Sequence, residues 1–336
     1  MIGRFLVAAL ATLAGPAFAE TPEEFYAGKQ VTIICGSEAG SGYDAYARLF
    51  AQHLGRFIPG HPTLLVQNMP GAGTLVATNY LANVAPKDGT VIATVNSGMA
   101  AEPLFHPDTA KFDPRTINWL GSPTSEVQLI AVSPTARVQK FAQVFDTELV
   151  VAGTGGGTTI FPTLLNGVLG TKFKVVKGYA GANSGLLAFE RGEVEGMGAD
   201  TLVALTTTHG DLVAEGKARI IAHYALHPYT VIPNIDSVMD YAKTPEQKAA
   251  LLVVLSRQEI GRPYLMAAGV PADRVAAMRK AFAAAMVDPT LRADADKRRL
   301  EFDPVSAERI AEIVAETYAA PQSAIEKAKA VLGNQL

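Results

Sequence analysis

Short runs of β-branched residues alternate with longer stretches of helical spacing, and this alternation restricts the folds that the chain can adopt. In the first hundred residues it predicts strands at 30–35, 64–68 and 90–95, with helices at 44–54 and 75–84 between them. A strand–helix–strand rhythm of this kind is typical of a parallel sheet covered by helices. We therefore predict an α/β unit in this part of the chain.

The same rhythm restarts in the second half of the chain. The sequence predicts further strands at 149–152, 173–176 and 219–223, and helices at 160–169 and 185–191. A second α/β unit is therefore expected, which agrees with a length of 336 residues. The strand predicted between the two units, at 128–132, could belong to either of them.

The first nineteen residues have the pattern of a secretory signal peptide. A basic start at Arg4 precedes an apolar run over 5–13, and Ala17-Phe18-Ala19 forms an A-x-A cleavage motif. The run is too short to span a bilayer, which disfavours the alternative of an uncleaved N-terminal anchor. We expect cleavage after Ala19 and export of a soluble chain.

Charge and cysteine content narrow the function. The chain has 29 basic and 32 acidic residues, and loss of Arg4 with the leader changes the formal net charge from −3 to −4. A mildly acidic chain is a poor partner for nucleic acid, so we expect none. Any anion site must then be built locally, from backbone N–H groups and helix ends. Cys35, the only cysteine, is predicted as a buried core residue rather than a nucleophile, because no basic residue stands beside it.

Three glycine-rich turns each follow a predicted strand and precede a predicted helix, at 36–44, 68–74 and 152–159. Glycine lets backbone N–H groups converge on a ligand, and a helix N-terminus adds partial positive charge. In open parallel sheets such turns lie at the carboxyl ends of the strands, where ligands bind. Divided between two units, they predict a carboxylate site that needs no arginine, although each alone could serve only as a tight turn. Asp44 is expected to hold the shape of the first turn, since a bare carboxylate would repel an anionic ligand.

Four stretches of the sequence resemble one known family. AGSGYDAYAR at 39–48 is similar to the family pattern P-G-G-x-x-D-x-x-A-R, and VQNMPGAGT at 66–74 is similar to V-x-N-x-P-G-A-G-G. PKDGT at 86–90 resembles the family's D-G turn, and GYAGANSGLLAFERGEVEG at 178–196 resembles its Y-x-G stretch, helix and G-x-V-D. Over nearly its whole mature length the chain therefore resembles the periplasmic solute-binding receptors of tripartite tricarboxylate transport systems, the Bug or TctC-type proteins.

The resemblance implies an α/β, two-domain type II periplasmic-binding-protein fold. Each domain is expected to be a mostly parallel sheet flanked by helices, with a ligand cleft between the domains that closes like a flytrap. We assign 20–125 and 252–336 to domain 1 and 126–251 to domain 2, after a signal peptide at 1–19. The hinge is expected in the crossings near 122–133 and 251–263.

The resemblance also implies a site that holds ligand carboxylates with backbone amides and ordered waters. By position, the residues expected to bind ligand are Ser41, Gly42, Tyr43, Asp44, Gly71, Ala72, Gly73, Thr74, Gly155, Thr158, Thr159, Ala180, Gly181, Asn183 and Asp200. The strand-end acid of the family's V-D element falls near Glu195. The ligand expected is a small di- or tricarboxylate or an aromatic acid.

The chain departs from the family pattern at several of these positions. Gly36-Ser37 replace a Pro-Phe pair before the first loop, and Glu38 adds an acid beside the expected anion site. Ser41 and Thr74 each replace a loop glycine. Tyr43 is bulkier than the usual residue, and two roles stay open for it, a stack on an aromatic ring or a cap over the pocket.

An exported hydrolase or metal-dependent enzyme on an α/β scaffold is the main alternative. No serine has the G-x-S-x-G frame, and no G-x-G-x-x-G fingerprint is complete. His223 and His227 are four residues apart, but they follow a predicted strand and lack a nearby third ligand. Glu193 and Glu195 are expected to face solvent rather than to act as an acid–base pair. We therefore expect no catalysis, no cofactor and no metal.

The function expected from the sequence is that of a periplasmic receptor. It would capture a small organic carboxylate as a monomer and deliver it to the membrane components of a tripartite tricarboxylate-type transporter. A structural adaptor is a further alternative, which glycine-rich loops at strand ends disfavour because they cost chain entropy unless something needs them.

Overall fold

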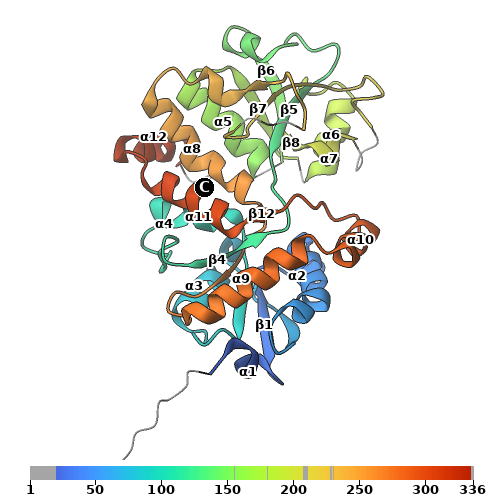
Figure 1. Ribbon diagram of the computed structural model, residues 1–336. Helices are drawn as coiled ribbons and strands as arrows, with labels where there is room; N and C mark the ends of the chain where they lie inside the picture. The colour runs from blue at the N-terminus through green and yellow to red at the C-terminus, as the bar shows by residue number, and fades with distance from the viewer. Residues whose placement is uncertain are drawn as a thin grey trace, which may run out of the picture.

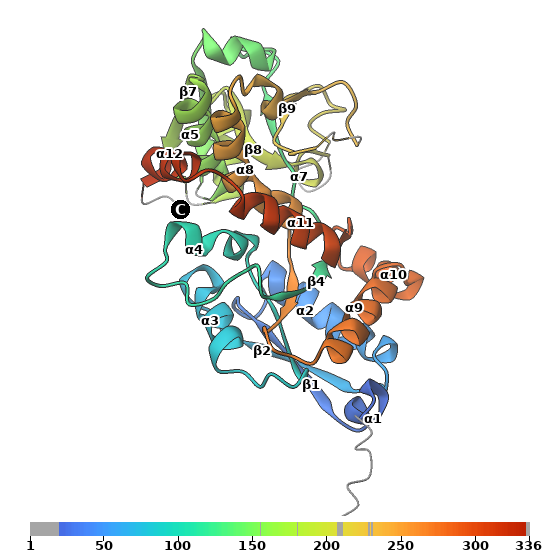
Figure 2. The same ribbon diagram turned by 60° about the vertical axis from the view of Figure 1, so that its left-hand side comes forward.

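The computed structural model describes residues 20–154, 156–179, 181–206, 211–227, 229 and 231–333. The strands form two separate six-stranded sheets, each with helices packed against it. Figure 1 shows the two α/β units one above the other, with α11 (Ala307–Tyr318) between them, and the rotated view in Figure 2 agrees. The two-unit α/β organisation predicted from the sequence is therefore confirmed.

The first sheet has the strand order β12-β4-β11-β3-β1-β2. Its strands are β1 (Gln30–Cys35), β2 (Thr63–Asn68), β3 (Val91–Thr94), β4 (Asn118–Ser122), β11 (Tyr264–Met266) and β12 (Val305–Ser306). Strand β1 runs parallel to both neighbours, in a register that pairs Ile33 with Val66 and with Ile92. The remaining pairings are antiparallel, so the sheet is mixed rather than mostly parallel.

Helices from both ends of the chain complete the core of the first unit. They are α1 (Pro22–Tyr26), α2 (Gly42–His53), α3 (Leu75–Asn83), α4 (Glu102–Phe105), α9 (Ala272–Met286) and α10 (Pro289–Lys297). Helix α2 begins where the Ser41 side chain accepts from the N–H of Asp44. Its Phe50 ring lies 4.8 Å from Phe282 of α9 and 4.9 Å from Tyr264 of β11, measured between ring centroids. Segments more than two hundred residues apart in sequence thus share one core.

The second sheet has the strand order β10-β9-β5-β8-β6-β7. Its strands are β5 (Gln128–Val132), β6 (Leu149–Gly153), β7 (Phe173–Lys177), β8 (Gly196–Thr201), β9 (Arg219–His223) and β10 (Asp236–Ser237). Strand β6 runs parallel to β7 and β8, whereas β5, which brings the chain in from the first unit, runs antiparallel to β8 and β9. The helices of this unit are α5 (Gly157–Leu169), α6 (Ala182–Glu190), α7 (Leu202–Thr206) and α8 (Pro245–Ile260).

The chain passes between the two sheets at 123–127, from β4 to β5, and at 261–263, from α8 to β11. Both crossings lie within the segments predicted for the hinge. They are bonded to each other, because the N–H of Glu126 donates to the carbonyl of Gln258 at 2.7 Å. Gly261 has φ +62°, and a Cβ on it would overlap the carbonyl oxygen of Thr124. Only glycine fits this close approach.

The C-terminal helix α12 (Gln322–Leu332) packs against α5 and α8 of the second unit. Its Ala324, Ala328 and Leu332 are buried in the same core as Leu164 and Leu251. Helix α11 contacts both β4 of the first unit and α8 of the second. The division that assigns all of 252–336 to domain 1 stays a prediction, and these helices are the part of the chain on which it depends.

Every strand and helix predicted from the residue pattern is present, with ends that differ by a few residues. The largest differences are at α5 and α6, which begin three residues before the predicted starts. The pattern missed β4, β8, β10, β11 and β12, which are two to six residues long. No helix in the part of the chain that the structure describes is long and apolar enough to cross a membrane.

Candidate functional site

Three parallel strands of the first sheet end at one edge, and each continues into a loop. Strand β1 leads into loop one (36–41), β2 into loop two (69–74) and β3 into loop three (95–100). Ligands of open α/β sheets bind at such an edge. Loops one and two were predicted as site loops, whereas loop three was not, although it follows a predicted strand in the same way.

Loop one is held in place by the carboxylate of Asp44. Its Oδ2 accepts from the N–H of Gly40 at 2.8 Å and from Nε of Arg48 at 2.9 Å, and its Oδ1 accepts from Nδ2 of Asn68 at 2.9 Å. Asn68 also donates to the carbonyl of Ser37 at 2.9 Å. Burial alone would raise the pKa of Asp44, but the bonds from Arg48, Gly40 and Asn68 lower it below its ordinary value of 3.8. Asp44 thus joins loop one to the end of β2, as expected for a residue that organises the loop.

Loop two has positive φ at four successive residues: +146° at Gly71, +44° at Ala72, +61° at Gly73 and +82° at Thr74. This backbone is costly for threonine, which is β-branched. Thr74 is only 5% exposed, and its Oγ1 accepts from the N–H of Asn96 in loop three at 2.9 Å. The conformation explains why the family pattern has glycine where this chain has Thr74.

Loops one and two bring unpaired backbone donors to the same edge of the sheet. No described residue accepts a hydrogen bond from the N–H of Gly42, Tyr43, Ala72 or Gly73. The first two open α2, where N–H groups have no partner within the helix. Gly42, Ala72 and Gly73 are exposed. Gly42, Tyr43, Ala72 and Gly73, four of the eight residues predicted in the first unit, therefore supply amide donors at this edge, whereas the N–H groups of Ser41, Asp44 and Thr74 are bonded within their own loops.

The predicted residues that follow β6 lie at the start of α5. Thr158 Oγ1 accepts from the N–H of Thr154 at 2.9 Å, which closes the turn between strand and helix. Thr159 is buried in the first turn of α5. Gly155, also predicted here, lies outside the described residues.

The other predicted residues of the second unit follow β7 and β8. Gly181 precedes the first residue of α6, and Asn183 is exposed in the first turn of that helix. Asp200 lies near the end of β8, where its Oδ1 accepts from the N–H of Thr201 at 2.9 Å. Because β7, β6 and β8 are parallel neighbours, these residues share one edge of the second sheet with Thr158. Ala180 and the leader at 1–19 with its cleavage site lie outside the described residues.

The site loops of both units approach the C-terminal end of α8. A Cβ placed on Gly157, at the start of α5, would lie 3.8 Å from Oε1 of Gln128. The N–H of Gln128 donates to Oε1 of Gln258 at 2.8 Å. The neighbouring Arg257 donates from Nη2 to Oδ1 of Asn96, in loop three, at 3.1 Å. The end of α8 therefore connects the start of α5 with the loops of the first unit.

Two arginines that the sequence analysis did not select lie at this point, Arg257 and Arg262. Nη2 of Arg262 lies 2.7 Å from Oε1 of Glu126, and its guanidinium lies 4.7 Å from the ring centre of Tyr43. The available sequence signal was a pair of arginines, five residues apart, inside the predicted hinge segment.

The Tyr43 side chain packs against the core of the first unit, and its hydroxyl lies near the backbone of Ser97 in loop three. Burial and, to a lesser extent, Glu126 raise the pKa of Tyr43 to about 12, against the opposite effects of Arg262, Arg257 and the backbone of Ser97. The guanidinium of Arg262 lies near the Tyr43 ring, and both roles, a stack on an aromatic ligand and a cap over the pocket, stay predictions.

Residues weighed for enzymatic chemistry have structural surroundings. Cys35 is fully buried in the first core, and burial raises the pKa of its thiol. Glu195 precedes β8, at the opposite end from the site loops, and accepts from Nε of Arg137 at 2.8 Å. His227 is exposed, with Nε2 3.7 Å from Oε2 of Glu259. Across the described ranges, no three His, Cys, Asp or Glu residues are grouped to hold a metal ion.

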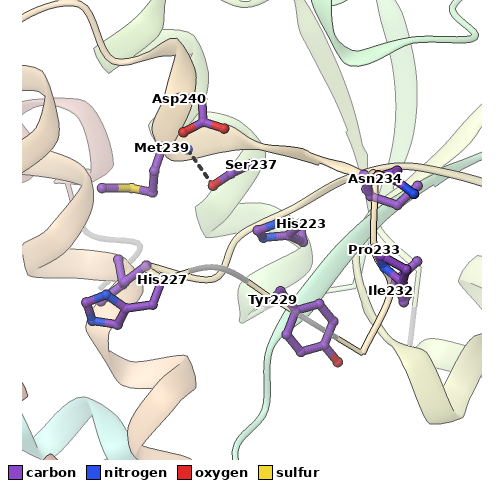
Figure 3. Close-up of a pocket in the computed structure, with 11 residues that line it drawn as sticks. His223, His227, Tyr229, Ile232, Pro233, Asn234, Ser237, Met239 and Asp240 are labelled. Atoms are coloured by element: carbon purple, nitrogen blue, oxygen red, sulfur yellow. Dashed lines mark hydrogen bonds between the residues drawn. The ribbon is translucent and has the colours of Figure 1, made fainter.

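A cavity of about 440 Å³ lies beside β9 and β10 (Figure 3). His223, only 4% exposed, lines it next to Tyr229, with ring centroids 5.6 Å apart. Burial lowers the pKa of His223, and no described residue bonds to its Nδ1. None of the thirteen predicted binding residues that the structure describes lines this cavity, and in the sheet β5 separates β9 from β8, β6 and β7.

Two α/β sheets joined by paired crossings, with site loops at the strand ends of each sheet, define a two-domain binding protein of the periplasmic type. The sequence matches the family described as "Tripartite tricarboxylate transporter family receptor", or TctC, over residues 47–329. The chain belongs to this family, whose members are periplasmic solute-binding receptors, which are not a class of enzymes. No curated protein sequence matches it.

Solved structures show the same fold. A ligand-free TctC solute binding protein from Polaromonas is 18% identical, with a TM-score of 0.71 and coverage of 89% of this chain and 98% of that chain. A protein from R. palustris with adipate is 19% identical, with a TM-score of 0.56 and coverage of 91% and 97%. MatC from Rhodopseudomonas palustris with bound malate is 19% identical, with a TM-score of 0.54 and coverage of 90% and 99%. The family predicted from the sequence motifs is therefore confirmed.

Proposed function

We propose that the protein captures a small organic carboxylate between its two units and delivers it to the membrane components of a tripartite tricarboxylate-type transporter. The observation that supports this most is the group of N–H donors at Gly42, Tyr43, Ala72 and Gly73, to which no described residue bonds. A carboxylate accepts such bonds, and the start of α2 adds partial positive charge. The relatives solved with adipate and malate hold dicarboxylates.

In the proposed mechanism the ligand is bound first by loops one and two and then by the start of α5, the start of α6 and Asp200. Closure about the crossings follows, because a ligand shifts a conformational equilibrium only through contacts that differ between the two states. The moving bodies are domain 1 (20–125 and 252–336) and domain 2 (126–251). The working form is a periplasmic monomer from which the leader has been cleaved after Ala19.

Thermal unfolding of residues 20–336 tests this proposal. Malate, adipate, citrate and benzoate are added one at a time, and adipamide serves as an uncharged control for adipate. At least one acid should raise the unfolding midpoint in proportion to the logarithm of its concentration, and adipamide should not. If no acid shifts the midpoint, the carboxylate assignment is wrong, and a fall in the midpoint with chelator would instead indicate a metal site.

A further inference from the structure

Arg257 is a half-buried cation without a carboxylate partner. It lies in the last turn of α8, and its one hydrogen bond to a described residue is the bond to Asn96. No described carboxylate oxygen lies within 4.0 Å of its nitrogens. A buried charge is costly unless it is paired. Arg257 is therefore suited to receive an anion from outside the chain.

The acids near Arg257 are already engaged elsewhere. Glu126 pairs with Arg262 at 2.7 Å, and Glu102 pairs with Nδ1 of His106 at 2.9 Å. Burial lowers the pKa of Arg257, while Tyr43, Glu126 and Glu102 oppose that effect. An arginine side chain stays protonated even so, which leaves a positive charge at the junction of the two units with no described carboxylate in direct contact.

A short chain of hydrogen bonds links Arg257 to the amide donors of loop two. Asn96 accepts from Arg257 through Oδ1, and the same oxygen accepts from the N–H of Gly98 at 2.8 Å. The N–H of Asn96 donates in turn to Oγ1 of Thr74, which directly follows the exposed Ala72 and Gly73. The guanidinium at the end of α8 and the amide donors of loop two are thus two separate groups with the chemistry to bind an anion, joined through loop three.

We propose that Arg257 binds a second carboxylate of the ligand, so that this receptor selects dicarboxylates over monocarboxylates. This inference rests on the proposed function and specifies its ligand. One carboxylate is held by the backbone N–H groups of loops one and two, and the other by the planar guanidinium, which matches a carboxylate through two parallel N–H bonds. A monocarboxylate leaves Arg257 uncompensated and therefore binds more weakly.

Calorimetric titration of residues 20–336 with matched pairs of acids tests the assignment. Adipate is compared with hexanoate, and malate with 3-hydroxybutyrate, because the members of each pair differ by one carboxylate. Wild type should bind one diacid at least about tenfold more tightly than its partner. Arg257→Gln should weaken that diacid about 10- to 100-fold and change the affinity for the monoacid less than about twofold. Arg257→Lys keeps the positive charge but loses the planar guanidinium with its two parallel N–H donors. Its affinity for the diacid should therefore lie between the affinities of wild type and Arg257→Gln.

The control variant is Arg137→Gln, which removes an exposed arginine of the second unit that pairs with Glu195. It should bind both acids as wild type does. If wild type binds a carboxylate but shows no preference for diacids, or if Arg257→Gln weakens both acids equally, the role of Arg257 is wrong and the receptor function stands. If wild type binds none of these acids, citrate or benzoate, the proposed function itself fails. If Arg257→Gln does not fold, two measurements still test the role of Arg257: the preference of wild type for the diacid over the monoacid, and the weaker binding of the diacid by Arg257→Lys.

Discussion

Gly36 and Thr74 occupy one space that only one of them can fill. A Cβ placed on Gly36 would lie 2.7 Å from Cβ of Thr74 and 2.9 Å from its Cγ2. Both positions depart from the family pattern, which has proline where this chain has Gly36 and glycine where it has Thr74. The two departures therefore compensate each other sterically. The added hydroxyl joins loop two to loop three through Asn96.

This compensation predicts a strong dependence of one substitution on the other. Gly36→Ala alone should lower the free energy of unfolding by about 1–3 kcal/mol, because the new methyl group meets Thr74. In a Thr74→Gly background the same substitution should cost much less. Urea unfolding of the four proteins gives the coupling energy. Gly181→Ala, at an extended residue with no atom within 4 Å, is the control, and equal costs in both backgrounds would contradict the compensation.

Asp44→Asn should lower both the stability of the protein and its affinity for ligand. The loss of charge weakens the bonds that hold loop one, at a cost of about 1–3 kcal/mol at pH 7. Because the folded-state pKa of Asp44 lies below 3.8, its stabilisation is present above about pH 4 and is lost as the pH falls through the folded pKa. The difference in unfolding free energy between wild type and variant should therefore shrink from pH 7 to pH 3. A difference in unfolding free energy that does not change with pH would contradict the linkage. Tighter ligand binding by the variant would show that the Asp44 carboxylate repels the ligand rather than organising the loop.

Gly73→Val should weaken binding without unfolding the protein. Gly73 has φ +61° and no neighbour within 4 Å, so a side chain fits but has to adopt a left-handed backbone, at a cost of about 1–2 kcal/mol. The new side chain would also crowd the exposed N–H groups of loop two. A loss of affinity of about tenfold or more is expected by titration with the best acid of the panel. Gly28→Val is the matched control, because Gly28 has φ +70° and equally open surroundings but does not belong to the predicted site. Unchanged affinity in Gly73→Val would remove loop two from the binding site.

Gly261→Ala should destabilise the protein more than a change at an ordinary turn glycine. Its Cβ would overlap the carbonyl of Thr124 in the other crossing, in addition to the strain of φ +62°. The expected loss is about 3 kcal/mol or more in the free energy of unfolding. Gly269→Ala carries a similar backbone strain at φ +87°, but its nearest neighbour is Cδ of Lys87 at 3.6 Å. Equal losses in the two variants would show that the contact between the crossings is loose.

The sequence was informative where structure is local. Strands β1 to β3 and helices α2 and α3 could be predicted because short runs of β-branched residues alternate there with longer stretches of helical spacing. The organising role of Asp44 followed from its place in the first turn of a helix. By contrast, β10, β11 and β12 are two or three residues long and too short to show a period. Each depends on partners distant in sequence, since β10 and β12 bond to the edges of their sheets and β11 bonds between β4 and β3.

Arg257 and Arg262 could not be placed from the sequence because their partners are distant. The bond between Arg257 and Asn96 joins residues 161 positions apart, and it depends on how α8 returns to the first unit. The sequence therefore predicted a site of backbone amides and missed the cations beside it. The departure at Thr74 was visible in the sequence, but its contact with Gly36 was not.

The paired crossings limit how the two units can move. Besides the bond between Glu126 and Gln258, the N–H of Arg262 donates to Oγ of Ser122 at 2.8 Å, and the N–H of Ser125 donates to the carbonyl of Asp303 at 3.0 Å. These bonds tie the crossings to each other and to the segment before β12, and α11 adds a further link because it contacts both β4 and α8. A movement of one unit against the other therefore has to be carried by backbone that is hydrogen-bonded on several sides, rather than by a free linker.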